Sequence, residues 1–254
     1  MPPFLFSWYN ETGDAMITSV TNEKIKYLLS LQKKKNRDDT SEFIVEGHHL
    51  VSEALKRNLV KAIFTVNSND YPSDITFLIS DTVMNKITSV IEPQGVVAIV
   101  KKPPVKEIGN RILILDRIQD PGNFGTLLRS ALAFGFDTVL YEDSVDPYNP
   151  KVLRSTQGAI FEINLVENDI LKFMDNNPEY IYYGTALKEA FSLTTIPRKD
   201  AKIAIILGNE GAGVRPEILS KTHLNIFIDI DTVESLNVAV AGSIIMYHLR
   251  RLEP

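Results

Sequence analysis

The sequence contains no cysteine and only four histidines. Disulfides, thiolate metal sites and every mechanism that needs a cysteine nucleophile are therefore excluded. The histidines, His48, His49, His223 and His248, lack the spacing and the neighbouring carboxylates of a zinc site. We expect no metal site. No G-x-S-x-G elbow accompanies a plausible His and Asp pair, so hydrolase chemistry has no support.

Long hydrophobic runs are also missing. The longest apolar stretches, such as Ile112–Leu115 and Ala204–Leu207, have the length of strands and fall far short of the ~20 residues of a membrane helix. The opening MPPFLFSWYN lacks the basic start, apolar core and cleavage site of a secretory signal. We expect a folded cytoplasmic protein whose residues 1–16 form a leader without an assigned function.

A basic excess, the usual mark of a nucleic-acid partner, is absent, since the net charge is −5. Residues 1–104 are neutral, with 12 Lys/Arg and 12 Asp/Glu, whereas residues 105–254 hold 15 and 20. Within the neutral half, six cations cluster, and they could hold phosphates. The alternative is a solvated helix end, because Lys favours the last turn of a helix. The cluster consists of Lys24, Lys26, Lys33, Lys34, Lys35 and Arg37.

The chain is long enough for two domains, and its pattern predicts both as α/β. A small domain over 17–103 begins with an amphipathic helix over 21–34 and continues with short strands and helices. The segment KKPPVKEIGN resists regular structure, and we place a linker at 104–110. Residues 111–254 alternate strands and helices, which predicts a mainly parallel sheet. There we expect a strand over 159–165, and helices over 215–221 and 235–250.

The first candidate site segment follows the strand RILILD, at the strand end where open α/β sheets bind ligands. A helix beginning near Asp120 would carry Asn123, Gly125 and Arg129 toward one cleft. The alternative assigns them structural roles: Asn123 as the helix cap, Gly125 for close packing, and Arg129 as a surface cation.

Two later segments of the second domain are also candidate site segments. LGNEGAGV follows a strand and matches neither the G-x-G-x-x-G nor the P-loop motif. Its glycines permit positive φ and close backbone approach to a flat ligand, and the alternative is a tight turn between a strand and a helix. Glu210 within it would be either a functional carboxylate or a surface acid at a helix start. In ESLNVAVAGSIIMYHL, Ser235 is predicted to cap a helix with a small-residue face, with Asn237 beside it.

In this order the three segments resemble the three motifs of the SpoU/TrmH branch of the SPOUT RNA methyltransferases. FIVEGHHLVSEAL (43–55) is similar to the small RNA-recognition domain that often precedes the catalytic one. The resemblance covers nearly the whole chain from about residue 17. It implies a C-terminal α/β fold with a deep trefoil knot and a homodimer formed through that domain. It also implies S-adenosylmethionine-dependent transfer of a methyl group to a ribose 2′-hydroxyl of structured RNA, and we expect this RNA to be ribosomal.

By the same resemblance, residues take roles motif by motif. Arg129 is the catalytic arginine, Asn123 its partner, and Glu210 the acid of the second motif, while Ser235 and Asn237 are the polar pair of the third. Arginine is effectively always protonated, so we assign Arg129 to the target phosphate and the developing alkoxide, not to proton removal. The resemblance gives the cofactor positions as Leu207, Gly208, Ile228, Leu236 and Asn237. For RNA we add the basic cluster to Arg129, because it lies in the neutral half of the chain while the catalytic half is acidic, and the RNA positions are then Lys33, Lys34, Lys35, Arg37 and Arg129.

One departure lies in the third motif, which in many relatives opens with Ile-Pro-Met and here reads Ile228-Asp229-Ile230. Asp229 would either face the cofactor's positive sulfur or mark a differently shaped loop. Two other functions stay open: a non-catalytic RNA-binding protein of this fold, and a SPOUT enzyme that methylates a base nitrogen. A Rossmann dehydrogenase lacks its fingerprint.

Overall fold

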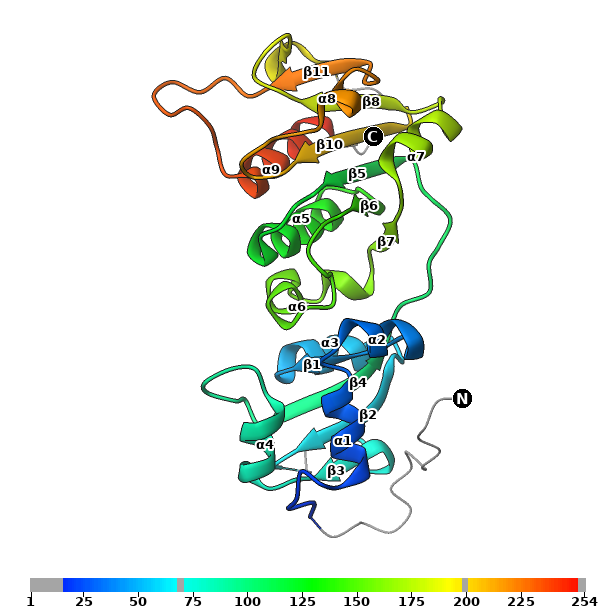
Figure 1. Ribbon diagram of the computed structural model, residues 1–254, viewed down its shortest axis with the longest axis vertical. Coiled ribbons are helices and arrows are strands. Elements are labelled where there is room, and N and C mark those ends of the chain that lie inside the picture. Colours follow the sequence, from blue (N-terminus) through cyan, green and yellow to red (C-terminus); the bar gives the residue numbers. More distant parts are fainter. Residues whose placement is uncertain (1–15, 68–70, 198–200, 251–254) are drawn as a thin grey trace. The chain divides into compact units, whose positions relative to one another are not determined.

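The computed structural model describes residues 16–67, 71–197 and 201–250, so residues 1–15 of the predicted leader lie outside the described part. The chain divides into two compact units between Pro104 and Val105, and each contains one β-sheet (Figure 1). In the described residues no helix has the length and apolar character needed to cross a membrane.

The N-terminal unit is built on a four-stranded sheet with the order β1-β4-β2-β3. The central strand β4 pairs antiparallel with β1 and β2, and β3 adds to β2 in parallel. Helices α1 and α4 contribute Ile25, Leu28 and Ile87 to a core that includes Phe64 and Phe77. The elements are α1 (Glu23–Ser30), α2 (Lys34–Thr40), β1 (Glu42–Glu46), α3 (His48–Lys56), β2 (Val60–Thr65), β3 (Thr76–Leu78), α4 (Asp81–Ile87) and β4 (Val96–Lys101).

The helix predicted over 21–34 is wrong in extent, because the chain forms two helices there. α1 ends at Ser30, and α2 starts at Lys34. Arg37 explains the break: it is 5% exposed and donates to the carbonyls of Leu31 and Gln32, both at 2.8 Å. Here a buried guanidinium of α2 donates hydrogen bonds to carbonyl groups at the end of α1. Hydrophobic spacing in the sequence cannot reveal such a contact.

The C-terminal unit is built on a seven-stranded sheet with the order β7-β6-β5-β10-β8-β11-β9, in which every described pair is parallel. The predicted α/β fold with a mainly parallel sheet is confirmed. The strands are β5 (Arg111–Asp116), β6 (Thr138–Glu142), β7 (Asn164–Glu167), β8 (Ile181–Thr185), β9 (Phe191–Ser192), β10 (Ile203–Gly208) and β11 (Leu224–Phe227).

Helices cover both faces of this sheet, which is why every residue of its central strands β5 and β10 is buried. α7 and α8 pack on the face that contains Ile114 and Ile206. α5 and α9 pack together on the opposite face, where Leu207 and Leu127 meet Gly242. The helices are α5 (Pro121–Ala133), α6 (Pro150–Thr156), α7 (Ile170–Asn176), α8 (Pro216–Leu219) and α9 (Val238–Leu249).

Three predicted elements of this unit need correction. The strand expected over 159–165 is a 3₁₀-helix, Ala159–Phe161, followed by β7. The helix expected over 215–221 shortens to α8, which Pro216 starts. The long helix starts at Val238 because Asn237, not Ser235, is its N-cap and accepts from the amides of Ala239 and Val240.

Candidate functional site

A pocket of about 530 Å³ lies where β10, β8 and β11 end, at the carboxyl edge of the parallel sheet. This is within the usual size of a small-molecule site, ~300–1,000 Å³. The whole segment from Leu207 to Val214 lines it. Four of the five predicted cofactor positions do so as well, namely Leu207, Gly208, Ile228 and Leu236, together with Glu210 and Ser235.

The glycine at 208 is required by close packing of the backbone. A Cβ on Gly208 would lie 2.0 Å from the carbonyl carbon of Gly213 and from the nitrogen of Val214. Gly213 itself has φ +69°, a left-handed conformation that favours glycine. The loop therefore folds back tightly on the end of β10 and presents backbone groups to the pocket.

A chain of hydrogen bonds joins the three predicted motifs beside this pocket. Asn237 Nδ2 donates to Asn123 Oδ1 at 2.9 Å, and Asn123 Nδ2 donates to Glu210 Oε1 at 3.2 Å. We call Glu210, Asn123 and Asn237 the polar chain. Its members come from positions up to 114 residues apart. The structure thus brings together one residue from each motif.

Glu210 holds the loop that leads into α5. Its Oε1 also accepts from the amide of Asp120 at 3.0 Å, and its Oε2 accepts from the amide of Gln119 at 3.2 Å. Desolvation raises the pKa of Glu210, but these backbone donors and Asn123 outweigh it and hold the pKa below its usual value. Glu210 is therefore an ionised acceptor whose oxygens are already engaged, which suits positioning better than proton removal.

Arg129 lies on α5 one turn beyond Gly125, as predicted, and it is exposed. Its side chain forms no hydrogen bond or ion pair with the residues that the structure describes. Gly125 packs against α6, where an added Cβ would meet Ser155 at 2.5 Å. Ser130, on another face of α5, bonds to Ser243 of α9 at 2.8 Å. These contacts fix the helix, so Arg129 projects from a rigid support.

The two third-motif residues separate. Ser235 lines the pocket and is exposed, whereas Asn237 caps α9 and belongs to the polar chain. Asp229 accepts a hydrogen bond from Ser192 of β9. Its neighbours Ile228 and Ile230 line the pocket, but Asp229 is not among the described lining residues. This geometry favours the differently shaped loop over an acid that faces the cofactor.

The lysine cluster lies at the wrong helix end for its structural explanation. Lys33 is the N-cap of α2, Lys34 and Lys35 form its first turn, and all three are exposed. Cations at a helix N-terminus oppose the macrodipole. The helix macrodipole therefore does not account for them. Arg37 does not join them, because its buried guanidinium is committed to the carbonyls of α1's end.

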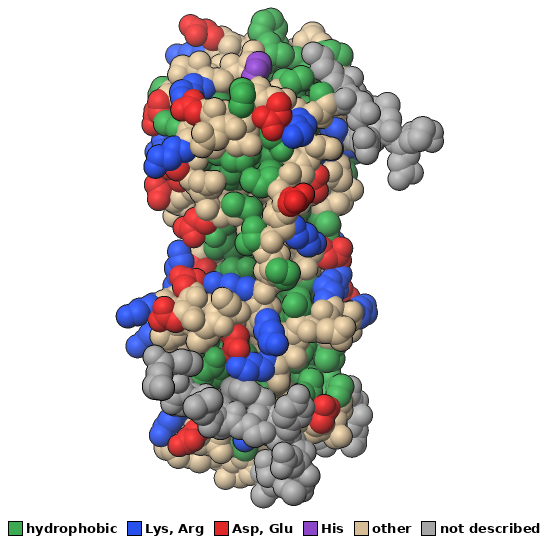
Figure 2. Space-filling model, turned by 90° about the vertical axis from the view of Figure 1, so that its right-hand side faces the viewer, with side chains coloured by type: hydrophobic (Ala, Val, Ile, Leu, Met, Phe, Trp, Pro, Cys, Tyr) green, Lys and Arg blue, Asp and Glu red, His purple; other side chains and the backbone are tan. Residues whose placement is uncertain are grey.

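Charge in the C-terminal unit is mixed. On the face that Figure 2 shows, its acidic and basic side chains are interspersed. Phosphate binding there would depend on particular residues such as Arg129. In the described residues, no group of three or more His, Asp or Glu side chains could hold a metal ion.

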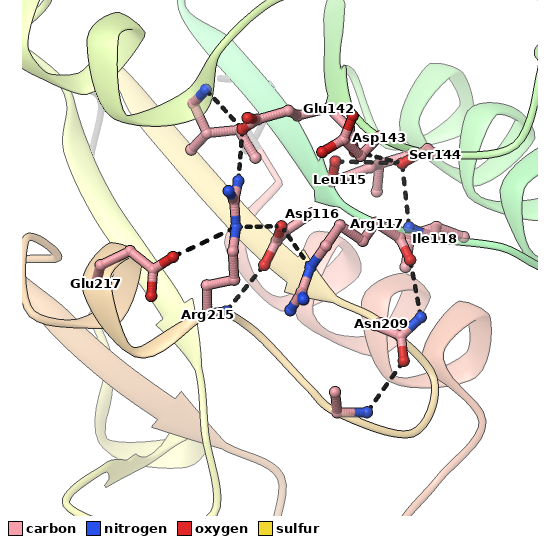
Figure 3. A network of polar contacts seen from close by, with 12 residues as sticks. Leu115, Asp116, Arg117, Ile118, Glu142, Asp143, Ser144, Asn209, Arg215 and Glu217 are labelled. Carbon is pink, nitrogen blue, oxygen red and sulfur yellow. Dashed lines mark hydrogen bonds and ion pairs between the residues drawn. The ribbon is translucent and has the colours of Figure 1, made fainter.

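Sequence reasoning missed part of the pocket wall. Thr185 ends β8, Ala186, Leu187 and Lys188 follow it, and all four line the pocket. They carry no motif, but their place after a parallel strand was a usable signal. It also missed a network in which the buried Asp116 and the partly buried Glu142 both pair with Arg215 (Figure 3). Three charged residues far apart in the sequence give no sign that they pair.

Comparison with known proteins agrees with this geometry. Residues 110–247, which contain all three motifs, match the SpoU rRNA Methylase family. The chain belongs to the SpoU rRNA methylase family. The resemblance seen in the sequence is confirmed, and with it the methyltransferase activity. Residues 22–98 match the MRM3-like substrate binding domain.

Relatives cover nearly the whole chain. It is 39% identical to the 23S rRNA (guanosine(2553)-2'-O)-methyltransferase RlmP of Bacillus subtilis, over 92% of this chain and 98% of that protein. An AdoMet-bound rRNA methyltransferase from Sinorhizobium meliloti superposes with TM-score 0.81 at 27% identity, over 92% and 97% of the two chains. An RNA 2'-O ribose methyltransferase superposes with TM-score 0.78 at 26% identity, over 92% and 98%.

Proposed function

We propose that this chain transfers a methyl group from S-adenosylmethionine to a ribose 2′-hydroxyl of ribosomal RNA. The observation that carries the proposal is the polar chain, which joins all three motifs beside a pocket of cofactor size. The pocket wall suits a molecule with flat apolar and polar parts. It combines backbone groups of the glycine-rich loop with side chains such as Val214, Ile226 and Ile245.

The cofactor supplies a methyl group on a positively charged sulfur. In our proposal Leu207, Gly208, Ile228 and Leu236 hold it, and Asn237 fixes the start of α9 against it. The ribose oxygen gains the methyl and loses its proton to a neighbouring group or water. Ser235 contributes an exposed hydroxyl group to the pocket wall.

Arg129 has the role of holding the target nucleotide. A ribose hydroxyl is a weak nucleophile, so catalysis requires that negative charge developing on the oxygen be stabilised. A guanidinium presents a planar fork that can bind a phosphate and face the developing alkoxide. In this proposal Asn123 and Glu210 are positioning residues that hold the start of α5, from which Arg129 projects.

For the substrate, we propose the same ribosomal guanosine that the name of the Bacillus subtilis relative gives, because the similarity spans both units. Lys33, Lys34 and Lys35 would bind RNA phosphates on the N-terminal unit. A ribosomal substrate agrees with the expected cytoplasmic location.

We further propose that the chain is a homodimer through α9 and α5. Val240, Ile244 and Tyr247 follow helical spacing on α9 and are 49%, 39% and 52% exposed, and Leu132 of α5 is 36% exposed. An apolar helix face left open in one chain fits a self-complementary two-fold contact. Sedimentation of the intact protein, compared with a Val240→Glu/Ile244→Glu variant, tests this.

The function is tested in two steps. Calorimetric titration with S-adenosylmethionine and its demethylated product, with NAD as control, should show binding of the first two only. Incubation of unmodified ribosomal RNA with radiolabelled cofactor should then place the labelled methyl on a ribose 2′-oxygen. The phosphodiester next to that ribose should therefore resist alkaline cleavage. A methyl on a base nitrogen would indicate the other SPOUT chemistry, and cofactor binding that is absent even with RNA would indicate a non-catalytic RNA-binding protein.

A further inference from the structure

The loop Asn209–Arg215, which forms much of the pocket wall, is tied down at its beginning by Asn209. The side-chain Nδ2 of Asn209 donates to the carbonyl of Arg117 at 2.9 Å. Its Oδ1 accepts from the amides of Gly211 and Ala212, both at 3.0 Å. The loop is therefore shaped and attached by one amide side chain (Figure 3).

The end of the loop is tied down by Arg215. Its amide donates to Asp116 Oδ2 and its Nε to Asp116 Oδ1, both at 2.8 Å. Its Nη2 reaches the carboxylate of Glu142 at the end of β6. Arg215 directly follows Val214, the last residue of the loop that lines the pocket, and its guanidinium attaches this point of the chain to the ends of β5 and β6.

Both attachments converge on consecutive residues. Asp116 ends β5, and Arg117 follows it with a left-handed φ of +59°. This two-residue corner leads into the first-motif segment that carries Asn123 and Arg129. The shape of the loop and the entry to α5 are consequently set at the same point.

The ion pair between Arg215 and Asp116 depends on a particular arrangement of the two side chains. Asp116 is 0% exposed, and a buried charge is costly unless it is paired and hydrogen-bonded. Desolvation lowers the pKa of Arg215, but its bond to Glu142 and the charge of Asp116 outweigh it and raise the pKa above its usual value. The guanidinium meets Asp116 and Glu142 with two different nitrogens, whereas a lysine would have to reach both carboxylates with one.

We propose that Arg215 and Asp116 are positioning residues for methyl transfer, acting as a clamp that sets the loop Asn209–Arg215 against the entry to α5. The inference rests on the proposed function for its kinetic consequence. If the clamp is loosened, the cofactor wall and the support of Arg129 shift together, while the lysines of the N-terminal unit are unaffected.

The test uses Arg215→Lys, which keeps the charge and loses the fork. We expect the KM for S-adenosylmethionine to rise about tenfold or more and kcat to fall, with RNA affinity within about twofold, because a relaxed buried site loses binding geometry. Glu217→Gln is the matched control. Glu217 approaches the same guanidinium at 4.0 Å from the exposed side and should change nothing.

Asp116→Asn is the second variant, since it keeps the volume and one acceptor. Because both changes act on one clamp, the double variant should be no worse than the more severe single one. Hydrogen exchange of the amides at 211–213 should accelerate in both variants and not in Glu217→Gln, a readout that needs no methylation. Lower thermal stability with unchanged KM, kcat and loop exchange would overturn the inference while the proposed function stood. An inactive wild-type protein would overturn the proposed function alone, because exchange still reports on the clamp.

Discussion

Two sets of residues with proposed functional roles differ in how many of their polar groups are hydrogen-bonded or paired within the free chain. The bonded region, made of Asp116, Asn123, Glu210, Arg215 and Asn237, satisfies its polar groups internally across three segments. The open region is a set of exposed cations that belong to two separate units, Arg129 on α5 of the C-terminal unit and, independently, Lys33, Lys34 and Lys35 on α2 of the N-terminal unit.

The difference follows from what each region is proposed to bind. A small cofactor with a fixed shape is bound best by walls that are already ordered, because no ordering cost is then added. RNA binds through its phosphates, and exposed cations that neutralise these phosphates release the counterions condensed on the RNA. On our proposal, therefore, the cofactor wall is already formed in the free chain, whereas the contacts to RNA form only when RNA binds.

The most severe change in the open region should be Arg129→Ala. We expect kcat to fall about 10²–10³-fold, the usual loss when a group that stabilises transition-state charge is removed. Cofactor affinity should stay within about twofold, because Arg129 lies outside the described pocket wall. Single-turnover methylation and calorimetry measure the two effects. Arg129→Lys with full activity would show that charge alone suffices, against the planar-fork role.

The most severe change in the bonded region should be Gly208→Ala. Its Cβ would lie 2.0 Å from backbone atoms of Gly213 and Val214, so the loop must move. We expect cofactor affinity to fall about 10–100-fold, which corresponds to the 1–3 kcal/mol typical of overpacking.

Gly211→Ala is the matched control for this prediction, because its Cβ would find its nearest neighbour at an ordinary 3.7 Å. Calorimetric titration of both variants with S-adenosylmethionine gives the comparison. If Gly208→Ala bound the cofactor like the wild type, the preformed wall would not be what determines affinity.

A smaller effect is expected on the RNA side from replacing Lys33, Lys34 and Lys35 with Ala together. RNA affinity should fall about tenfold, and the slope of log K against log salt should flatten by about 2, since each lost phosphate contact removes about 0.7. Thermal stability should not fall, because cations at the start of α2 oppose its dipole.

Replacement of the same three lysines with Arg keeps the charge and should restore both the affinity and the slope. Salt-dependent RNA titrations check the three proteins side by side. A slope unchanged in the alanine variant would remove this surface from the RNA path and leave Arg129 as the proposed phosphate contact of the open region.

The sequence predicted the fold class and the grouping of the motifs because both depend on regular signals. The apolar run Ile112–Leu115 and the small face of α9 reflect burial, and the ends of parallel strands meet at one edge. It could not predict the break at Lys33 or the clamp at Arg215. Both depend on a charged side chain that finds buried partners elsewhere, which no periodicity encodes. The trefoil knot stays a prediction from the family.

The smallest effects are expected at Asn237, where two substitutions distinguish a contribution to stability from a contribution to methylation. Asn237 caps α9 and also donates to Asn123, so Asn237→Ala loses both contacts and should lower stability by about 1 kcal/mol. Asn237→Ser keeps a capping oxygen but is too short to reach Asn123, so its stability should stay near wild type. Methylation should fall about fivefold in both. If Asn237→Ser were fully active, the polar chain would serve only to cap α9, and catalysis would depend on the open region alone.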